Sequence, residues 1–261
     1  THFEMHDRNW YNAYPIPAGT ILQPGERLVV VEDEEKFSVI HPDVLNKVGS
    51  TLFKLDNGGD QIQVMDRKGA TVLQSTYDNS APWPCTPDGF GRSLERRPGS
   101  NDPEQPESWF DGCMGGSPGT IYSPCEDDLI VSEINYHSAD AQDAGDWFEI
   151  KNQLNTSIDL SGWSIRDDDD EHIFTFSNGV TLAPGKYLVL CENEVTFRTI
   201  HDAVPRLVGD LGFGLSNGSD VIRLYNAGGQ LQLSVCYDDI APWITAADGE
   251  GYTLELTDYD A

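Results

Sequence analysis

The acidic side chains are the main chemical resource of this sequence, and Asp167–Glu171 places five carboxylates on one short segment. Their mutual repulsion would be relieved by a hard cation such as calcium, which takes six to eight oxygen ligands. The segment lacks the spaced acidic pattern of an EF-hand loop, so a solvated acidic turn is favoured over a calcium site. The calcium alternative has Asp167 and Asp169 as principal ligands, with further candidates at Asp168, Asp170 and Asp7.

Two tryptophans offer a second kind of chemistry, because an exposed indole can stack on a sugar ring. Trp83 and Trp243 each follow an Ala-Pro pair, in segments that match one another. Packing at the end or rim of a domain is the favoured interpretation. A carbohydrate-binding platform built on these two residues is the alternative.

Nucleophilic catalysis finds little support in the sequence. Gly115–Gly119 and Gly214–Gly218 satisfy the G-x-S-x-G pattern, but neither has the strand and helix that a nucleophile elbow needs. His41 and His201 occupy matching positions after short helical patterns, which indicates packing or capping rather than general-base catalysis. We therefore expect no enzymatic activity of the serine-hydrolase kind.

Glycoside hydrolysis requires two carboxylates that face each other across a cleft. Glu133, Asp146 and Glu149 form the most ordered acidic group, on two predicted neighbouring strands. Alternate positions on a sandwich strand commonly face solvent, so a solvated face is favoured and catalysis is not predicted.

Five cysteines occur without any C-x-x-C pair, which disfavours a zinc ribbon or a thioredoxin-like site. An oxidising, exported setting would allow two disulfides and leave Cys125 over. The pairs expected are Cys85 with Cys113 and Cys191 with Cys236, although sequence alone does not fix connectivity and five buried free thiols are the alternative.

The charge balance excludes several classes of partner. Acidic residues number 44 against 16 basic ones, for a formal charge of −28, so a phosphate backbone would be repelled and nucleic-acid binding is disfavoured unless divalent cations bridge. No apolar run approaches the roughly 20 residues of a membrane helix, so membrane insertion is not expected. The first residues contain no signal-peptide pattern, and any such segment has been removed or lies outside this sequence.

An internal repeat organises the chain. One constant shift, called the repeat offset, aligns 3–95 with 163–255 without a gap, so that Thr20–Val29 lies on Val180–Val189. The first copy lacks counterparts of the segments 128–135 and 146–150, and the second lacks the tail after Glu95. Both ends therefore look cut, and we expect two domains, 1–123 and 124–261.

Short apolar segments alternate with clusters of Gly, Asn, Asp and Pro, which is typical of a β-sandwich or barrel. Two hairpins are predicted, around Asp66–Gly69 and Asn226–Gly229. Short helices are predicted within 34–46 and 194–206, where apolar residues recur at helical spacing.

The ordered motifs of the second copy resemble those of a lamin-tail domain of the bacterial exported type. They are LIVSEINYH, GDWFEIKN, IDLSGWSIRDDDD, TLAPGKYLVLCE, GLSNGSDVIRLYNAGG and YDDIAPW. The resemblance covers nearly the whole chain and implies an all-β fold of two tandem immunoglobulin-like sandwiches. It also implies an accessory or structural module of exported proteins.

The expected function is a non-catalytic structural or adhesive module, secreted or at the cell surface, within a repeat array or an assembly. Since the first domain lacks two strands, a protein partner or a neighbouring copy could complete it by β-strand addition. The alternative is a substrate-binding module of a larger exported enzyme, recognising a polysaccharide or calcium-bridged nucleic acid.

Overall fold

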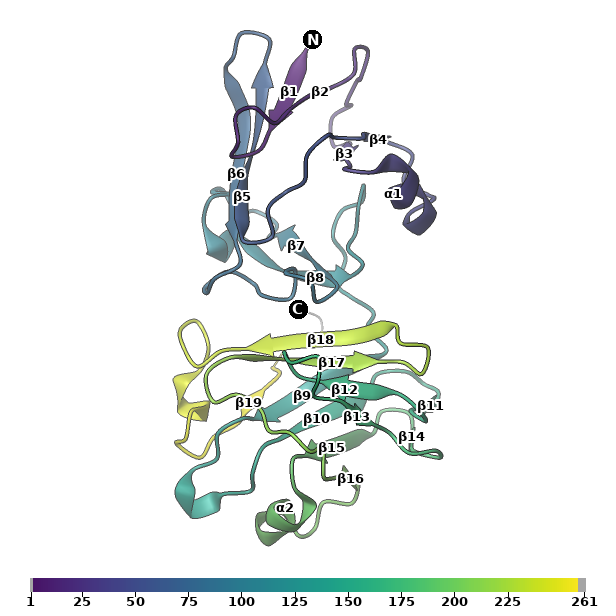
Figure 1. Cartoon of the computed structure of the whole chain (residues 1–261), viewed down its shortest axis with the longest axis vertical. Coiled ribbons are helices and arrows are strands. Elements are labelled where there is room, and N and C mark those ends of the chain that lie inside the picture. The colour runs from purple at the N-terminus through teal and green to yellow at the C-terminus, as the bar shows by residue number, and fades with distance from the viewer. Residues whose placement is uncertain (1, 258–261) are drawn as a thin grey trace. The chain divides into compact units, whose positions relative to one another are not determined.

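The computed structural model describes residues 2–257, and the chain divides between Ser123 and Pro124 into two compact units. The first unit, residues 2–123, is called unit 1, and the second, from residue 124 onward, is called unit 2. Strands predominate in both (Figure 1). None of the helices in the described range is long and apolar enough to cross a membrane.

Unit 2 is an immunoglobulin-like sandwich of two main sheets, with a two-stranded sheet, β11-β14, beside them. The five-stranded sheet has the order β16-β15-β10-β9-β19, and the four-stranded sheet has the order β13-β12-β17-β18. The strands are β9 (Leu129–Asn135), β10 (Trp147–Asn152), β11 (Ile158–Asp159), β12 (Ser164–Arg166), β13 (Phe174–Thr175), β14 (Thr181–Leu182), β15 (Tyr187–Cys191), β16 (Leu207–Val208), β17 (Asp220–Tyr225), β18 (Leu231–Tyr237) and β19 (Leu254–Glu255). The helices are α2 (Glu194–Ile200) and the 3-10 turns η2 (Asp140–Gln142) and η3 (Thr245–Ala247).

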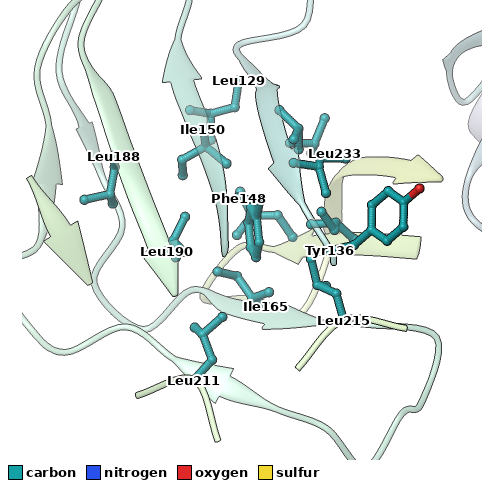
Figure 2. Packing of buried hydrophobic residues seen from close by; sticks show 14 of the residues in the cluster. Leu129, Tyr136, Phe148, Ile150, Ile165, Leu188, Leu190, Leu211, Leu215 and Leu233 are labelled. Carbon is teal, nitrogen blue, oxygen red and sulfur yellow. The ribbon is translucent and has the colours of Figure 1, made fainter. Parts of the chain in front are cut away.

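The inner faces of the two main sheets of unit 2 enclose one hydrophobic core (Figure 2). Phe148 and Ile150 of β10 enter it from one sheet, and Leu224 and Leu233 enter it from the other. A second, smaller cluster lies where α2 packs, and contains Trp147, Val189, Cys191 and Phe197. Because successive side chains of a strand point to opposite faces, β10 and β15 supply both clusters.

Unit 1 has the order β2-β1-β5-β6 in its largest sheet, and two separate two-stranded sheets, β3-β4 and β7-β8. Its strands are β1 (Phe3–His6), β2 (Ala13–Pro15), β3 (Val29–Val30), β4 (Lys47–Val48), β5 (Gly59–Asp66), β6 (Thr71–Asp78), β7 (Arg92–Arg96) and β8 (Trp109–Met114). Its helices are α1 (Glu34–Ile40) and the 3-10 turn η1 (Pro106–Ser108).

Several local predictions are confirmed. The hairpins are β5–β6 and β17–β18, and their turns close with Gly69 and Gly229 at positive φ, which glycine adopts without steric cost. The predicted helices are α1 and α2, and the repeat offset superimposes the bounds of one on those of the other. Each begins at a capping side chain, Asp33 or Asn193, that accepts a hydrogen bond from a backbone N–H of the first turn.

Candidate functional site

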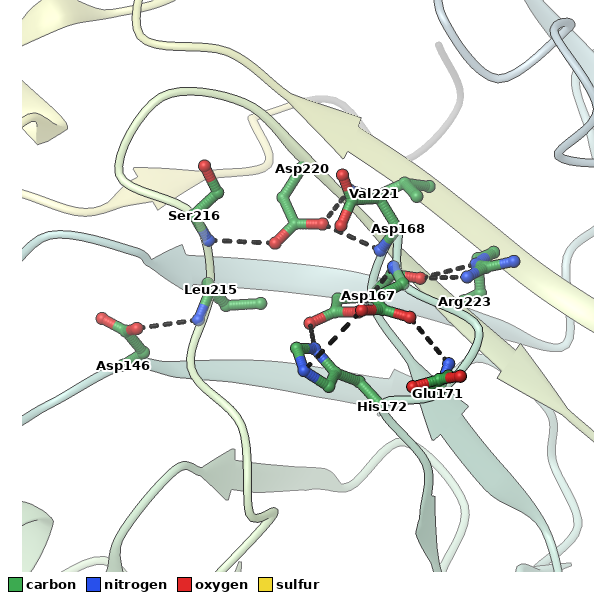
Figure 3. Close-up of polar contacts among 11 residues, drawn as sticks. Asp146, Asp167, Asp168, Glu171, His172, Leu215, Ser216, Asp220, Val221 and Arg223 are labelled. Carbon is green, nitrogen blue, oxygen red and sulfur yellow. Dashed lines mark hydrogen bonds and ion pairs between the residues drawn. The ribbon is translucent and has the colours of Figure 1, made fainter.

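The acidic turn of unit 2 is held by hydrogen bonds that start from a buried carboxylate (Figure 3). Asp167 accepts a 2.9 Å bond from the Asp169 N–H, and its other oxygen lies 2.7 Å from Nδ1 of His172. The neighbouring carboxylates raise the pKa of His172, chiefly through its hydrogen bond with Asp167. Arg223, buried on β17, donates from Nε to the Asp167 carbonyl oxygen.

A second buried carboxylate, Asp220, ties this turn to the start of β17. Its Oδ1 accepts from the N–H groups of Asp168 and Val221, at 3.0 and 2.7 Å, and its Oδ2 accepts from Ser216 N–H at 2.9 Å. Burial raises the pKa of Asp220, and the three backbone donors oppose that shift. Sequence reasoning missed this residue. The signal that could have found it is the acid that ends both DNGGD and SNGSD, two segments that the repeat offset aligns.

The same bonds occur in unit 1, each displaced by the repeat offset. Asp60 accepts from the N–H groups of Arg8, Gln61 and Asp56, at 2.9, 2.7 and 3.0 Å. Asp7 accepts from Asn9 N–H at 2.8 Å and from the Asn12 amide at 2.6 Å, where unit 2 has His172. Unit 1 keeps these hydrogen bonds although it lacks most of the acids of the segment Asp167–Glu171. The bonds therefore hold the backbone of the turn in both units.

The predicted metal ligands are only partly brought together. In the described range, carboxylate oxygens of Asp167, Asp168 and Asp220 lie within 4.8 Å of one another. Asp169 accepts from Glu171 N–H, and Asp170 pairs with Arg223 at 2.8 Å. Asp7 lies in unit 1, within its own turn. Since Asp167 and Asp220 already accept several hydrogen bonds, the cluster has a structural explanation that requires no cation.

The two candidate sugar-stacking tryptophans differ in their exposure to solvent. Trp83 is half-buried, and Trp243 is 38% exposed. Their backbone N–H groups donate to Ser80 and Ile240 in matching tight turns, which places both residues at the ends of turns following a hairpin.

The predicted pairing of Cys191 with Cys236 is wrong, because Cys191 is a buried free thiol. It packs beneath α2 with Trp147 and Phe197, and burial raises its pKa to about 11. Cys236 follows Val235, which packs on the core, and the alternation of a strand therefore turns Cys236 to the outer face of the other sheet. The two sulfur atoms are thus directed to opposite outer faces of the sandwich.

The remaining four cysteines, Cys125 included, are disulfide-bonded: Cys85, Cys113, Cys125 and Cys236. The expectation that Cys125 is left over is therefore wrong as well. The mutual pairing of Cys85 with Cys113 stays a prediction.

The candidate nucleophiles and bases are engaged in packing and turns. Ser117 donates to Glu95 at 2.5 Å, and the backbone N–H of Ser216 donates to Asp220. His41 and His201 lie at the C-terminal ends of α1 and α2, where each ring contacts a phenylalanine of its helix, as in the pair Phe197 and His201 at 4.8 Å. These contacts fit the predicted packing role.

A pocket of about 370 Å³ lies on the outer face of the five-stranded sheet of unit 2. Glu133 and Glu149 sit directly opposite each other on β9 and β10, and both line the pocket beside Trp147 and His201. Burial raises the pKa of Glu149, and the nearby Glu133 charge adds to the shift. Glu133 is held by the Thr253 hydroxyl at 2.6 Å. These two acids of the predicted group therefore share a half-buried pocket, not a fully solvated face.

Asp146, the third acid of that group, lies apart from this pair. Its Oδ2 accepts from the Leu215 N–H at 2.7 Å, and burial raises its pKa to about 6. The carboxylate thereby fastens the loop before β17 to the start of β10.

A comparison with protein families found one similarity, and it falls almost wholly within unit 2. Residues 123–239 match the model of the lamin tail domain family. This segment, which makes up most of unit 2, is therefore similar to a lamin tail domain. The lamin tail domain is an immunoglobulin-like module of a non-catalytic family, in agreement with the sandwich described above. No curated protein matches the chain.

Proposed function

We propose that this chain is a non-catalytic structural or adhesive module of an exported assembly, built from two copies of the lamin tail domain. The observation that carries the proposal is the shared network around Asp60 and Asp220. In both units the buried acid accepts hydrogen bonds from three backbone N–H groups of a turn. These carboxylates therefore stabilise the fold and are not positioned for catalysis.

The two-copy organisation is supported by agreement between the units at several levels. The helices α1 and α2, the parallel pairs β3–β4 and β15–β16, and the hairpins β5–β6 and β17–β18 occur at equivalent positions. Tyr77 and Tyr237 each donate a hydroxyl hydrogen bond to the carbonyl at position 56 or 216. Independent folds would not share such side-chain bonds at one constant offset.

The exported location is supported by the chemistry of the cysteines and by the surface charge. Four of the five cysteines are disulfide-bonded, and disulfides persist in oxidising compartments. The formal charge of −28 keeps the surface strongly hydrated and repels nucleic acids.

Antibody labelling of intact native cells tests the proposal, together with thiol labelling of the protein recovered from them. We expect labelling at the cell surface or in the medium, and a single free thiol per chain. A cytoplasmic protein with five reactive thiols would overturn the exported role.

A second candidate function is binding of a polar ligand, such as an oligosaccharide, in the pocket of Glu133 and Glu149. The observation that favours it is the shared placement of two carboxylates beside Trp147. Affinity electrophoresis against a polysaccharide panel tests it, with Glu133→Gln compared against Glu171→Gln, a variant on the acidic turn outside the pocket. Retardation of the wild type and of Glu171→Gln that is lost in Glu133→Gln would support binding in the pocket. Equal retardation of all three proteins, or no retardation of any of them on any polysaccharide, would contradict it.

A further inference from the structure

The pocket on the outer face of the five-stranded sheet lies wholly within unit 2 and has an apolar wall. Its volume of about 370 Å³ falls within the range of roughly 300–1,000 Å³ that small-ligand sites occupy. Trp147, Val189, Phe197, Ile200 and Val204 supply the apolar wall. The rings of Trp147 and Phe197 are buried and meet edge to face at 5.8 Å, so packing already holds this wall in place.

The charged part of the pocket belongs to a row of carboxylates that crosses three strands. Glu133 on β9 lies directly opposite Glu149 of β10 on one side and directly opposite Glu255 of β19 on the other. These three residues are called the glutamate row. Directly opposite side chains have Cβ atoms about 4.5–5.5 Å apart, and like charges at that spacing destabilise a sheet. A cation bound beside the glutamate row would relieve this repulsion.

No cation of the protein neutralises the glutamate row within the part of the chain that the structure describes. None of the residues that line the pocket is a lysine or an arginine, and none of the ion pairs formed by residues 2–257 includes the row. The next outward-facing residue of β10, Lys151, lies over the Tyr187 ring, 5.4 Å from its centre, and is outside the pocket lining. His201 does line the pocket, and its ring packs on Phe197 at 4.8 Å.

The two carboxylates that line the pocket each keep one oxygen open. Thr253 donates its hydroxyl to Oε1 of Glu133 at 2.6 Å, and Ser132 donates its hydroxyl to Oε1 of Glu149 at 2.7 Å. The second oxygen of each carboxylate accepts no hydrogen bond from any described residue. Burial raises the pKa of Glu149, and the charges of Glu133 and Glu255 add to the shift. The pocket therefore presents two acceptors that lack a donor.

Asn135 adds a third acceptor, independent of the glutamate row. It is only 7% exposed, and it lines the pocket one step along β9 from Glu133. Its amide nitrogen donates to the Ser138 hydroxyl at 2.8 Å and to the Gly145 carbonyl at 3.0 Å. Because a carbonyl only accepts, these bonds fix the amide orientation and turn Oδ1 the other way. Oδ1 accepts no hydrogen bond within residues 2–257 and is not sealed from solvent, so it opens into the pocket.

Three open acceptors and two carboxylate charges select among cations. A primary ammonium carries three N–H donors, no acceptor and one compact positive charge. A guanidinium binds a carboxylate best through both of its oxygens, but hydroxyl groups already occupy one oxygen of each carboxylate. A quaternary ammonium has no donor to offer. The pocket therefore matches a primary ammonium better than the other organic cations.

A metal ion is a poorer match to the glutamate row. Among residues 2–257, the acidic group that brings three ligand atoms within 4.8 Å of one another is Asp167, Asp168 and Asp220, and not the row. The apolar wall also has no use for a bare ion, whereas it can cover the hydrocarbon stem of an amine.

We propose that this pocket binds a primary alkylammonium group, held at the open oxygens of Glu133, Glu149 and Asn135, with its alkyl stem packed against Trp147 and Ile200. The inference rests on the second candidate function above, ligand binding in this pocket, and names the chemistry of the ligand. The same group occurs on the lysine side chain of a polypeptide and on free alkylamines.

The test titrates the isotope-labelled full chain with small amines and follows its amide signals by NMR. The compounds are Nα-acetyl-lysine amide, n-butylamine, Nα-acetyl-arginine amide and the Nε-acetylated form of the lysine compound. We expect saturable shifts of the Asn135 side-chain amide and of the Glu133 and Glu149 backbone amides with the first two compounds. The arginine compound should bind more weakly, and the Nε-acetylated compound should not bind. Tighter binding of the lysine compound assigns a polypeptide as the source, and tighter binding of butylamine assigns a free amine.

Charge variants separate the pocket from the general attraction of a chain with a formal charge of −28. Glu133→Gln and Glu149→Gln should each weaken amine binding at least about tenfold, because each removes one charged acceptor. Glu171→Gln, on the acidic turn, removes the same charge outside the pocket and should bind as the wild type does.

A second pair of variants tests the apolar wall. Ile200→Asn should weaken binding of butylamine about threefold, because the stem loses apolar contact. Val195→Asn lies on the same helix outside the pocket lining and should bind normally. Both sites are exposed, at 41% and 76%, so neither variant disturbs the core.

The proposal would be overturned by equal amine affinity of Glu133→Gln, Glu149→Gln and Glu171→Gln, or by equal binding of the Nε-acetylated compound. Absence of a saturable shift with both amines would overturn it as well. If a neutral polysaccharide bound in a manner that Glu133→Gln abolishes while both amines failed, the ammonium assignment would be wrong and ligand binding in the pocket would stand. None of these outcomes depends on where the protein resides.

Discussion

Replacing Asp220 by alanine should destabilise unit 2 strongly. The substitution leaves three backbone donors, on Asp168, Ser216 and Val221, without their acceptor. A buried donor left unsatisfied costs about 1–3 kcal/mol. The raised pKa of Asp220 means that burying its charge already costs free energy, and alanine relieves that cost. The lower end of the range therefore applies to each donor, and the free energy of unfolding should fall by about 3 kcal/mol.

Native-state hydrogen exchange of the Phe148 and Ile222 amides, which lie in the core of unit 2, measures this loss without interference from unit 1. Asp220→Asn keeps one side-chain oxygen and should lose about half as much. Asp202→Ala, at an exposed site, is the matched control and should stay within about 0.5 kcal/mol of the wild type. Equal stability of Asp220→Ala and Asp202→Ala would refute the structural role of the buried acid.

Three further predictions concern other groups of unit 2. Burial raises the pKa of Asp146 to about 6 from the ordinary 3.8, so its protonated form stabilises the fold fully below pH 3.8 and this stabilisation is lost as the pH rises through 6. Between pH 4 and 6 the free energy of unfolding of the wild type should fall by about 1–2 kcal/mol relative to that of Asp146→Asn, a figure discounted for partial solvation. Urea unfolding measures both proteins, and parallel pH profiles would contradict the prediction. Cys191 should resist iodoacetamide at pH 8 until the protein is unfolded in urea, as read by mass spectrometry, and labelling of the native protein within minutes would show that the thiol is accessible. Chelation of calcium should leave the melting temperature of unit 2 unchanged, because His172, Arg223 and backbone donors already compensate the negative charge of the acidic turn. A fall of several degrees in the wild type that is absent in Asp168→Asn would instead identify a calcium site at this turn.

The elements that depend on local chemistry could be predicted from the sequence. The hairpins follow from glycine-containing turns between alternating strands, and the two helices follow from helical spacing after Asp33 and Asn193. The β-sandwich follows from the resemblance, because several ordered motifs lie at the expected intervals. Such features need no knowledge of which segments meet in space.

The features that depend on packing between distant strands could not be predicted. Asp220 becomes part of the acidic turn only because β17 pairs with β12, which leads into that turn. The Cys191–Cys236 pairing failed because spacing does not say which face of each strand a side chain occupies. The Glu133–Glu149 pocket depends on the register of β9 against β10 and on the position of α2.

The most direct test of the assembly role is the absolute mass of the purified chain by light scattering over a range of concentrations. The account predicts reversible association above 28.8 kDa, driven by exposed apolar side chains of unit 1 such as Leu22, Leu55 and Leu73. Leu73→Asp should reduce this association, whereas Val72→Asp, on the same strand but the opposite face, is the control and should leave it unchanged. A 28.8 kDa monomer at every concentration would contradict the account.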